Sequence, residues 1–232
     1  MIKETIEKLH RELPSTVKLV AVSKFHPFDA IEDAYAAGQR IFAESRPQEL
    51  LTKVRRLEEI RGERGETDYM SDVQWHFIGH LQTNKLKMVL PYVYMVQSVD
   101  SVRLLDSIQS WASVNDRLIP VLLEPHVAAE ESKQGFSAGE IYEILDAACG
   151  GAYPNVRFCG IMGMATFTDD PSVVASDFSA LRSIFDTCRS RFPSLASDFT
   201  ELSIGMSDDY PIALEYGSTM VRIGSLIFGA RG

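Results

Sequence analysis

Short apolar segments recur along the whole chain, and this repetition constrains the fold more than any other feature of the sequence. Eight such segments are present, and most are continuously apolar rather than alternating with polar residues. Continuous apolar runs of this length are typical of strands buried on both faces, as in a parallel sheet. The predicted strands are Lys18–Lys24, Arg40–Glu44, Gln74–Gly79, Val93–Ser98, Arg117–Glu124, Arg157–Met164, Thr200–Gly205 and Thr219–Gly224.

The segments between these strands have helical patterns. The clearest are Pro27–Ala37, Pro47–Ile60, Ser101–Ala112, Ala138–Ala148 and Ser172–Arg191. Eight strand-then-helix units in 232 residues predict one α/β domain over residues 1–232, a (β/α)8 TIM barrel, a fold that typically takes about 250 residues. A doubly wound nucleotide-binding sheet would instead carry G-x-G-x-x-G after its first strand, where this chain reads KFHPFD.

Two flanking segments add detail to the predicted barrel. Ile2, Ile6, Leu9 and Leu13 follow helical spacing and predict an extra amino-terminal helix with one apolar face. The stretch 61–72, RGERGETDYMSD, is polar and contains glycine, so it predicts an exposed loop.

Charge and composition exclude several classes of protein. A net charge of -9 argues against a general nucleic-acid binder, because affinity for the phosphate backbone comes from clustered Lys and Arg. No apolar run approaches the ~18 residues of a membrane span, and the charged first residues lack the apolar core of a secretory signal. The three cysteines show no C-x-x-C spacing, which indicates reduced thiols and a cytoplasmic location.

Barrels of this kind place their active sites at the carboxyl ends of the strands, and phosphate sites often follow strands seven and eight. Lys24 ends the first predicted strand. It is either a solvated lysine or an amine that forms an imine with an aldehyde, for which burial or nearby positive charge must free the amine. Spacing alone leaves both interpretations open.

The last two strands supply candidate anion-binding residues. Ser207, followed by two aspartates, either caps a helix or receives an anion at the helix start. Arg222 lies inside an apolar strand, where it either pairs with an acid or serves a site, and the N–H groups of Gly224 and Ser225 could face a phosphate. His76 and His80 are not a helical metal pair, so we predict no metal site.

Several motifs together resemble one known family. VAVSK, FAESRPQE, WHFIGHLQTNK, GIMGMATF, IGMSDD and EYGSTMVRIGSLIFG are similar to the YggS/PROSC family of pyridoxal 5′-phosphate (PLP) homeostasis proteins, over residues 1 to 230. The resemblance implies a single (β/α)8 barrel like the N-terminal domain of alanine racemase. It also implies that Lys24 forms the aldimine with PLP, that Arg222 faces the pyridine nitrogen, and that Ser207, Gly224 and Ser225 hold the phosphate. Three departures stand out: Ser45 replaces a common asparagine, Phe25-His26 replaces a common threonine-lysine pair, and strand five ends in LLEPH where valine-asparagine is common.

The resemblance implies a protein that holds PLP and contributes to vitamin B6 and amino-acid balance, with no catalytic residues of its own. An arginine at the pyridine nitrogen disfavours an electron-accepting ring. Racemases with similar barrels add a second domain with an acid–base tyrosine, whereas this chain ends seven residues after Ser225. We therefore expect binding rather than turnover, in a monomer that delivers PLP to apoenzymes. The alternatives are a racemase-like enzyme on the bare barrel and a lysine-dependent aldolase without PLP.

Overall fold

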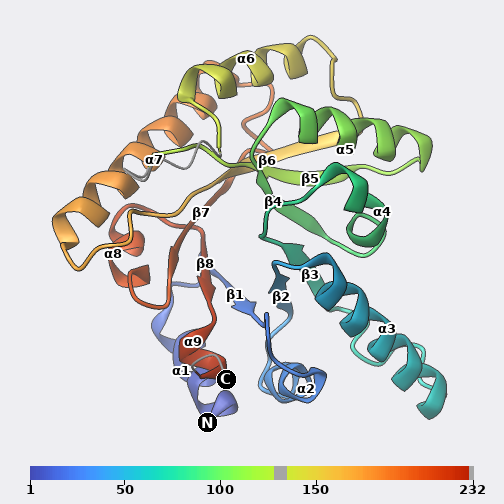
Figure 1. Ribbon diagram of the computed structural model, residues 1–232. Coiled ribbons are helices and arrows are strands. Elements are labelled where there is room, and N and C mark those ends of the chain that lie inside the picture. The colour runs from blue at the N-terminus through green and yellow to red at the C-terminus, as the bar shows by residue number, and fades with distance from the viewer. Residues whose placement is uncertain (128–134, 230–232) are drawn as a thin grey trace.

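The computed structural model describes residues 1–127 and 135–229, and its strands close into a barrel in sequence order. All neighbouring strands pair in parallel, and β8 pairs with β1 to complete the ring. Figure 1 shows the strands around a common axis with helices outside them. The predicted (β/α)8 barrel is confirmed. The strands are β1 (Lys18–Val22), β2 (Ile41–Glu44), β3 (Gln74–Phe77), β4 (Met95–Val99), β5 (Ile119–Leu123), β6 (Val156–Met162), β7 (Glu201–Met206) and β8 (Met220–Ile223).

Serine side chains cap the amino-terminal ends of two helices. The Ser101 hydroxyl accepts a hydrogen bond from the N–H of Leu104, and Ser137 and Glu140 form a capping box. The helices are α1 (Ile2–Glu12), α2 (Phe28–Ala36), α3 (Pro47–Arg64), α4 (Leu86–Val89), α5 (Val102–Val114), α6 (Ala138–Cys149), α7 (Pro171–Arg191), α8 (Tyr210–Glu215) and α9 (Ser225–Phe228), with a 3₁₀ turn η1 (Thr83–Lys85).

Both faces of the barrel wall are buried, which accounts for the continuous apolar runs in the sequence. Successive side chains of a strand point to opposite faces. In β1, Leu19 and Ala21 belong to the large cluster between the barrel and the helices, whereas Val20 and Val22 belong to the cluster inside the barrel. The other buried members of the inner cluster are Ala43, Met95, Leu122, Cys159, Met162 and Met220.

The amino-terminal helix is confirmed, and the predicted loop at 61–72 is wrong in its first part. Helix α1 buries Ile6 and Leu9, and it packs against α2 and α9 (Figure 1). Helix α3 continues to Arg64 and ends at Gly65, which has a φ of 66°. Good helix formers around Gly62 and basic residues in the last turn favour this extension, and the left-handed glycine then stops it.

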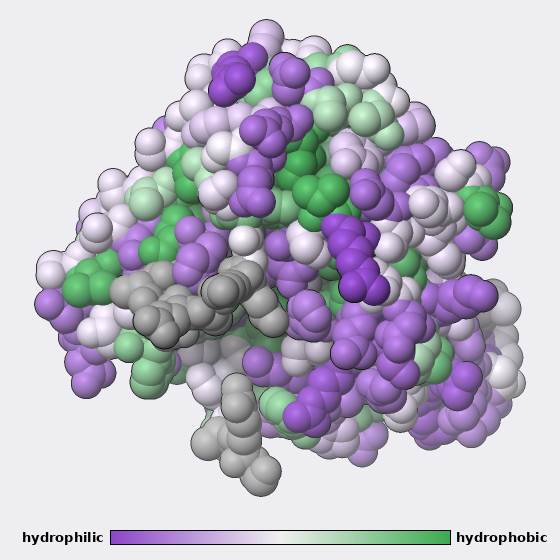
Figure 2. Space-filling model, turned by 45° about the horizontal axis from the view of Figure 1, so that its top comes forward, coloured by the Kyte–Doolittle hydropathy of each residue, from purple (hydrophilic) through white to green (hydrophobic). Residues whose placement is uncertain are grey.

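The outer surface is mainly polar. Figure 2 shows separate hydrophobic patches within a largely hydrophilic face. In the part of the chain that the structure describes, no helix combines the length and the hydrophobicity needed to cross a membrane.

Candidate functional site

Lys24 lies in a turn just past the end of β1, at the carboxyl mouth of the barrel, and is partly buried. The preceding residue is tightly held. The Ser23 hydroxyl donates to Glu44 Oε1 at 2.6 Å, and Lys53 Nζ donates both to the Ser23 carbonyl at 2.7 Å and to Glu44 Oε1 at 2.5 Å. Ser23, Glu44 and Lys53 are all buried. This network joins β1, β2 and α3 and fixes where the chain leaves the barrel wall before Lys24.

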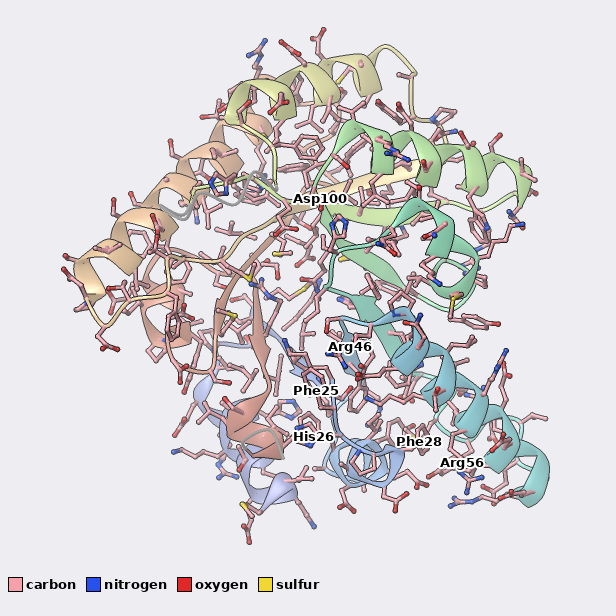
Figure 3. All side chains as sticks on the ribbon, in the orientation of Figure 1. Phe25, His26, Phe28, Arg46, Arg56 and Asp100 are labelled. Atoms are coloured by element: carbon pink, nitrogen blue, oxygen red, sulfur yellow. The ribbon has the colours of Figure 1, made fainter. Side chains whose placement is uncertain are left out.

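The residue after Lys24 is also held, in a strained backbone conformation. Phe25 has a φ of 69°, which side chains other than glycine rarely adopt. Its N–H donates to Glu49 Oε2 at 2.8 Å, and the guanidinium of Arg46 lies 4.5 Å from the centre of its ring. Figure 3 shows Phe25 and Arg46 together at this turn. Side chains of neighbouring elements therefore fix the backbone on both sides of Lys24.

Ser207 and Gly224 come together across β7 and β8. The N–H of Gly224 donates to Ser207 Oγ at 3.3 Å. Ser207 therefore does not cap a helix: α8 begins later, after Asp209, whose side chain accepts from the N–H of Met206 at 2.5 Å. Asp209 accepts this bond and sits directly before α8, which leaves the serine hydroxyl beside the end of β8. Ser225 opens α9 and is exposed.

Gly224 marks a close approach between β8 and β1. A Cβ at this position would lie 3.2 Å from the Val22 carbonyl oxygen and 3.3 Å from the Val22 Cβ. Such contacts are tighter than ordinary packing, so the position favours glycine. The ends of β7, β8 and β1 thus bring Ser207, Gly224 and the Lys24 turn to three neighbouring positions at one mouth of the barrel.

Arg222 is 4% exposed and points into the barrel without an ion-pair partner in the described residues. Its Nη1 donates to the carbonyl and the hydroxyl of Ser203 at 2.6 and 2.8 Å, and its Nη2 donates to the Gly163 carbonyl at 2.9 Å. Within residues 1–127 and 135–229, Arg222 therefore forms no ion pair with an acid, the simpler of the two sequence interpretations. Burial lowers the pKa of Arg222 to about 10, so the guanidinium stays charged at neutral pH.

Glu124, just past the end of β5, gives the mouth a second ionisable group. Burial raises the pKa of its carboxyl from 4.5 to about 7, against the opposing effect of Arg222 and with a smaller contribution from Asp100 (labelled in Figure 3). Glu124 lines a cavity of about 640 Å³ over β5, β6 and β7, together with Met164, Thr166, Met206 and Asp209 among the described residues. Met206, which directly precedes Ser207, lines this cavity, whereas Lys24 does not.

Sequence reasoning missed Glu44, Lys53, Glu49 and Glu124. Glu44 and Glu124 each end an apolar run, and the carboxyl ends of barrel strands are where functional residues are expected. Lys53 and Glu49 lie on α3 and carry no comparable signal, because most charged residues on a helix face solvent. Among the described residues, no cluster of three or more His, Cys, Asp or Glu side chains could hold a metal ion.

The fold and this arrangement define a class of protein: a parallel (β/α)8 barrel with a lysine, serine hydroxyls and a buried arginine gathered at the carboxyl mouth. The family model described as alanine racemase, N-terminal domain, matches residues 1–232. Alanine racemase from Corynebacterium glutamicum shares the fold, with a TM-score of 0.68 at 12% identity over 99% of this chain and 60% of that one.

Proteins with higher sequence identity to this chain define a narrower family within this class. Pyridoxal phosphate homeostasis protein of Homo sapiens is 38% identical over 99% of this chain and 82% of its own length, and that of Aquifex aeolicus is 35% identical over 92% and 87%. PipY of Synechococcus elongatus, solved with PLP bound, has a TM-score of 0.86 at 31% identity over 99% of this chain and 100% of its own. This chain belongs to the family of pyridoxal phosphate homeostasis proteins.

Proposed function

We propose that this chain binds PLP at the carboxyl mouth of the barrel and so contributes to vitamin B6 and amino-acid homeostasis. The observation that carries the proposal is the gathering of Lys24, Ser207 and Gly224 at the ends of three neighbouring strands. The names of the relatives and the PLP bound to PipY support it.

The residues at the mouth fit the chemical groups of PLP. When bound, PLP supplies an aldehyde that a lysine amine can capture in a reversible covalent bond. We propose Lys24, in the turn after β1, for this capture. The hydroxyls of Ser207 and Ser225 and the N–H groups at the start of α9 are donors for the phosphate, and Gly224 leaves room for its approach.

Arg222 is proposed to face the pyridine nitrogen. A guanidinium only donates hydrogen bonds, so it favours a ring nitrogen that is not protonated. Its three hydrogen bonds to Ser203 and Gly163 hold it rigidly for this role. A ring kept unprotonated accepts electrons poorly, which favours holding the cofactor over turning amino acids over.

We therefore propose a binding protein rather than an enzyme, acting as a cytoplasmic monomer that hands PLP to apoenzymes. Its relatives are named for homeostasis rather than for a reaction. Mixing the PLP-loaded protein with an apoenzyme and following the return of that enzyme's activity tests delivery, and light scattering tests the monomer.

The binding proposal is tested by adding PLP, reducing with borohydride and measuring the intact mass. We expect one PLP on the wild-type protein, with a visible absorption band, and both lost in Lys24→Ala. Lys3→Ala, the same change on an exposed lysine of α1, serves as the control and keeps both. An unchanged adduct in Lys24→Ala would show that another amine holds PLP.

The binding-only role is tested by incubating the loaded protein with L-amino acids in deuterated water. We expect no exchange of the α-proton above that seen with PLP alone. Rapid exchange that disappears in Lys24→Ala would instead establish a racemase-like enzyme.

A further inference from the structure

A second cavity, of about 460 Å³, opens at the other end of the barrel, where the strands begin. Its lining includes Lys18 of β1, His76 of β3, and Arg157 and Cys159 of β6. These residues lie at the opposite end of the strands from Lys24 and Ser207. Nothing in the proposed PLP site accounts for this cavity.

Two buried donors at this cavity lack partners. Three buried side-chain nitrogen or oxygen atoms have no hydrogen-bond partner within residues 1–127 and 135–229. Two of them, His76 Nε2 and Arg157 Nε, belong to residues that line the cavity. An unsatisfied buried donor costs about 1–3 kcal/mol, so two at one place call for an explanation.

A hydrogen-bond chain through the barrel sets the protonation of His76. Arg222 Nη1 donates to Ser203 Oγ, so the Ser203 hydroxyl hydrogen is directed to Gln97 Oε1, 2.7 Å away. The Gln97 amide then presents its NH₂ group to His76 Nδ1 at 2.7 Å. His76 Nδ1 must accept this bond, and the ring hydrogen therefore sits on Nε2.

His76 consequently offers a donor rather than a lone pair. Burial lowers the pKa of His76 to about 3, with a smaller contribution from Lys18, so the ring is neutral at physiological pH. A neutral ring with its hydrogen on Nε2 cannot coordinate a metal ion through that atom. It can donate one hydrogen bond to an oxygen.

Charges of both signs line the cavity: Lys18, Arg40 and Arg157 are positive, and Glu201 and the exposed Asp198 are negative. Lys18 forms an ion pair with Glu201, and Glu201 also accepts a hydrogen bond from Thr219 Oγ1 at 3.0 Å. Arg157 is partly buried and has no ion pair to a described residue. Its planar guanidinium is the group best suited to a carboxylate or a phosphate.

We propose that this cavity binds a small oxyanion, a carboxylate or a phosphate group, held by the guanidinium of Arg157 and the Nε2–H of His76. The ring of Tyr94, 45% exposed, stacks on His76 with 5.8 Å between centroids. Both rings line the cavity. This anion site is separate from the proposed PLP site, because it lies at the other end of the barrel.

The test follows the ring nitrogens of His76 by NMR in protein labelled with ¹⁵N-histidine, with His76→Gln used to assign the signals. We expect the Nε2-protonated form, and a shift that saturates when inorganic phosphate or acetate is added. Arg157→Gln should weaken this binding at least about tenfold, as expected for loss of a charge-assisted hydrogen bond. The relative response to the two anions separates a phosphate site from a carboxylate site.

Control variants separate this site from others. Arg56→Gln makes the same change on the exposed face of α3 (Figure 3) and should leave the titration unchanged. Ser207→Ala should also leave it unchanged, since phosphate at the other mouth would not contact His76. If Arg157→Gln does not fold, Lys18→Gln replaces it, with weaker binding expected. A shift that never saturates, or an identical titration in the Arg157 or Lys18 variant, overturns the proposal and leaves a cavity filled by water.

Discussion

Burial shifts the pKa values of single residues at the carboxyl mouth, and Glu124 is the clearest case. Its carboxyl has a pKa of about 7 because burial disfavours the ionised form more strongly than Arg222 favours it. Near neutral pH, Glu124 is partly protonated and can act as a donor or as an acceptor toward a ligand in the cavity.

Glu124 should make stability fall as the pH rises. Because its pKa is higher in the folded protein than the ordinary 4.5, the folded state binds more protons between pH 4.5 and 7. The free energy of unfolding then decreases across this range, by up to roughly 3 kcal/mol for a shift of this size. We expect Glu124→Gln to abolish this loss, so that the variant gains stability over the wild type as the pH rises.

Urea unfolding at a series of pH values measures the effect. Glu143→Gln, the same change on an exposed residue of α6, controls for the loss of one charge. A stability difference between Glu124→Gln and wild type that stays constant from pH 4.5 to 7 would contradict the assignment.

At the scale of elements, β1, β2 and α3 meet at a buried ion pair below the Lys24 turn. Lys53 is 6% exposed and Glu44 is fully buried. One oxygen of Glu44 has no hydrogen-bond partner among the residues that the structure describes, and burial raises the pKa of the Glu44 carboxyl despite the adjacent ammonium. Such a pair contributes little net stability, but removing one partner leaves an uncompensated charge.

We therefore expect Lys53→Met to destabilise the protein by about 3–5 kcal/mol, because Glu44 is left buried and unpaired. The double variant Lys53→Met with Glu44→Gln should be more stable than the single variant, since the neutral amide still accepts from Ser23. Denaturant unfolding of the three proteins measures this difference. A double variant no more stable than the single one would mean that Lys53 acts through packing alone.

The sequence predicted the elements well and their junctions less well, for a physical reason. Burial on both faces makes each strand a visible apolar run, so all eight were found. The first strand, however, was predicted to include Lys24, whereas β1 ends at Val22. The left-handed turn at Phe25 depends on Glu49 and Arg46 of the next unit, and contacts between distant residues leave no local pattern.

The site residues show the same limit. Ser207 looked equally like a helix cap, and only the pairing of β7 with β8 brings it to Gly224. Arg222 was recognisable as an unusual residue in an apolar strand, but its carbonyl partners come from β7 and from the end of β6. These contacts join residues that are distant in the sequence, and they form only when the strands close into the barrel.

At the scale of the whole molecule, a polar chain crosses the otherwise apolar barrel interior. Arg222 of β8, Ser203 of β7, Gln97 of β4 and His76 of β3 are linked in turn by hydrogen bonds of 2.7–2.8 Å. All four are buried. These hydrogen bonds link opposite walls of the barrel and connect the mouth at which Lys24 lies with the cavity at the other end.

Because the network is continuous, its members should be energetically coupled. Ser203→Ala leaves the Gln97 carbonyl oxygen and one Arg222 donor without their partner, so we expect a loss of about 1–3 kcal/mol. Gln97→Met removes the amide that accepts from Ser203 and donates to His76. Because Ser203 and His76 then each lose a partner, this single change should reduce the free energy of unfolding by a comparable amount.

In the double variant, both polar partners of the central hydrogen bond are replaced by apolar groups. The combined loss should therefore be smaller than the sum of the two single losses, a non-additivity measurable by urea unfolding of all four proteins. Strict additivity would mean that Ser203 and Gln97 stabilise the barrel independently and that the two ends of the molecule are not linked through them.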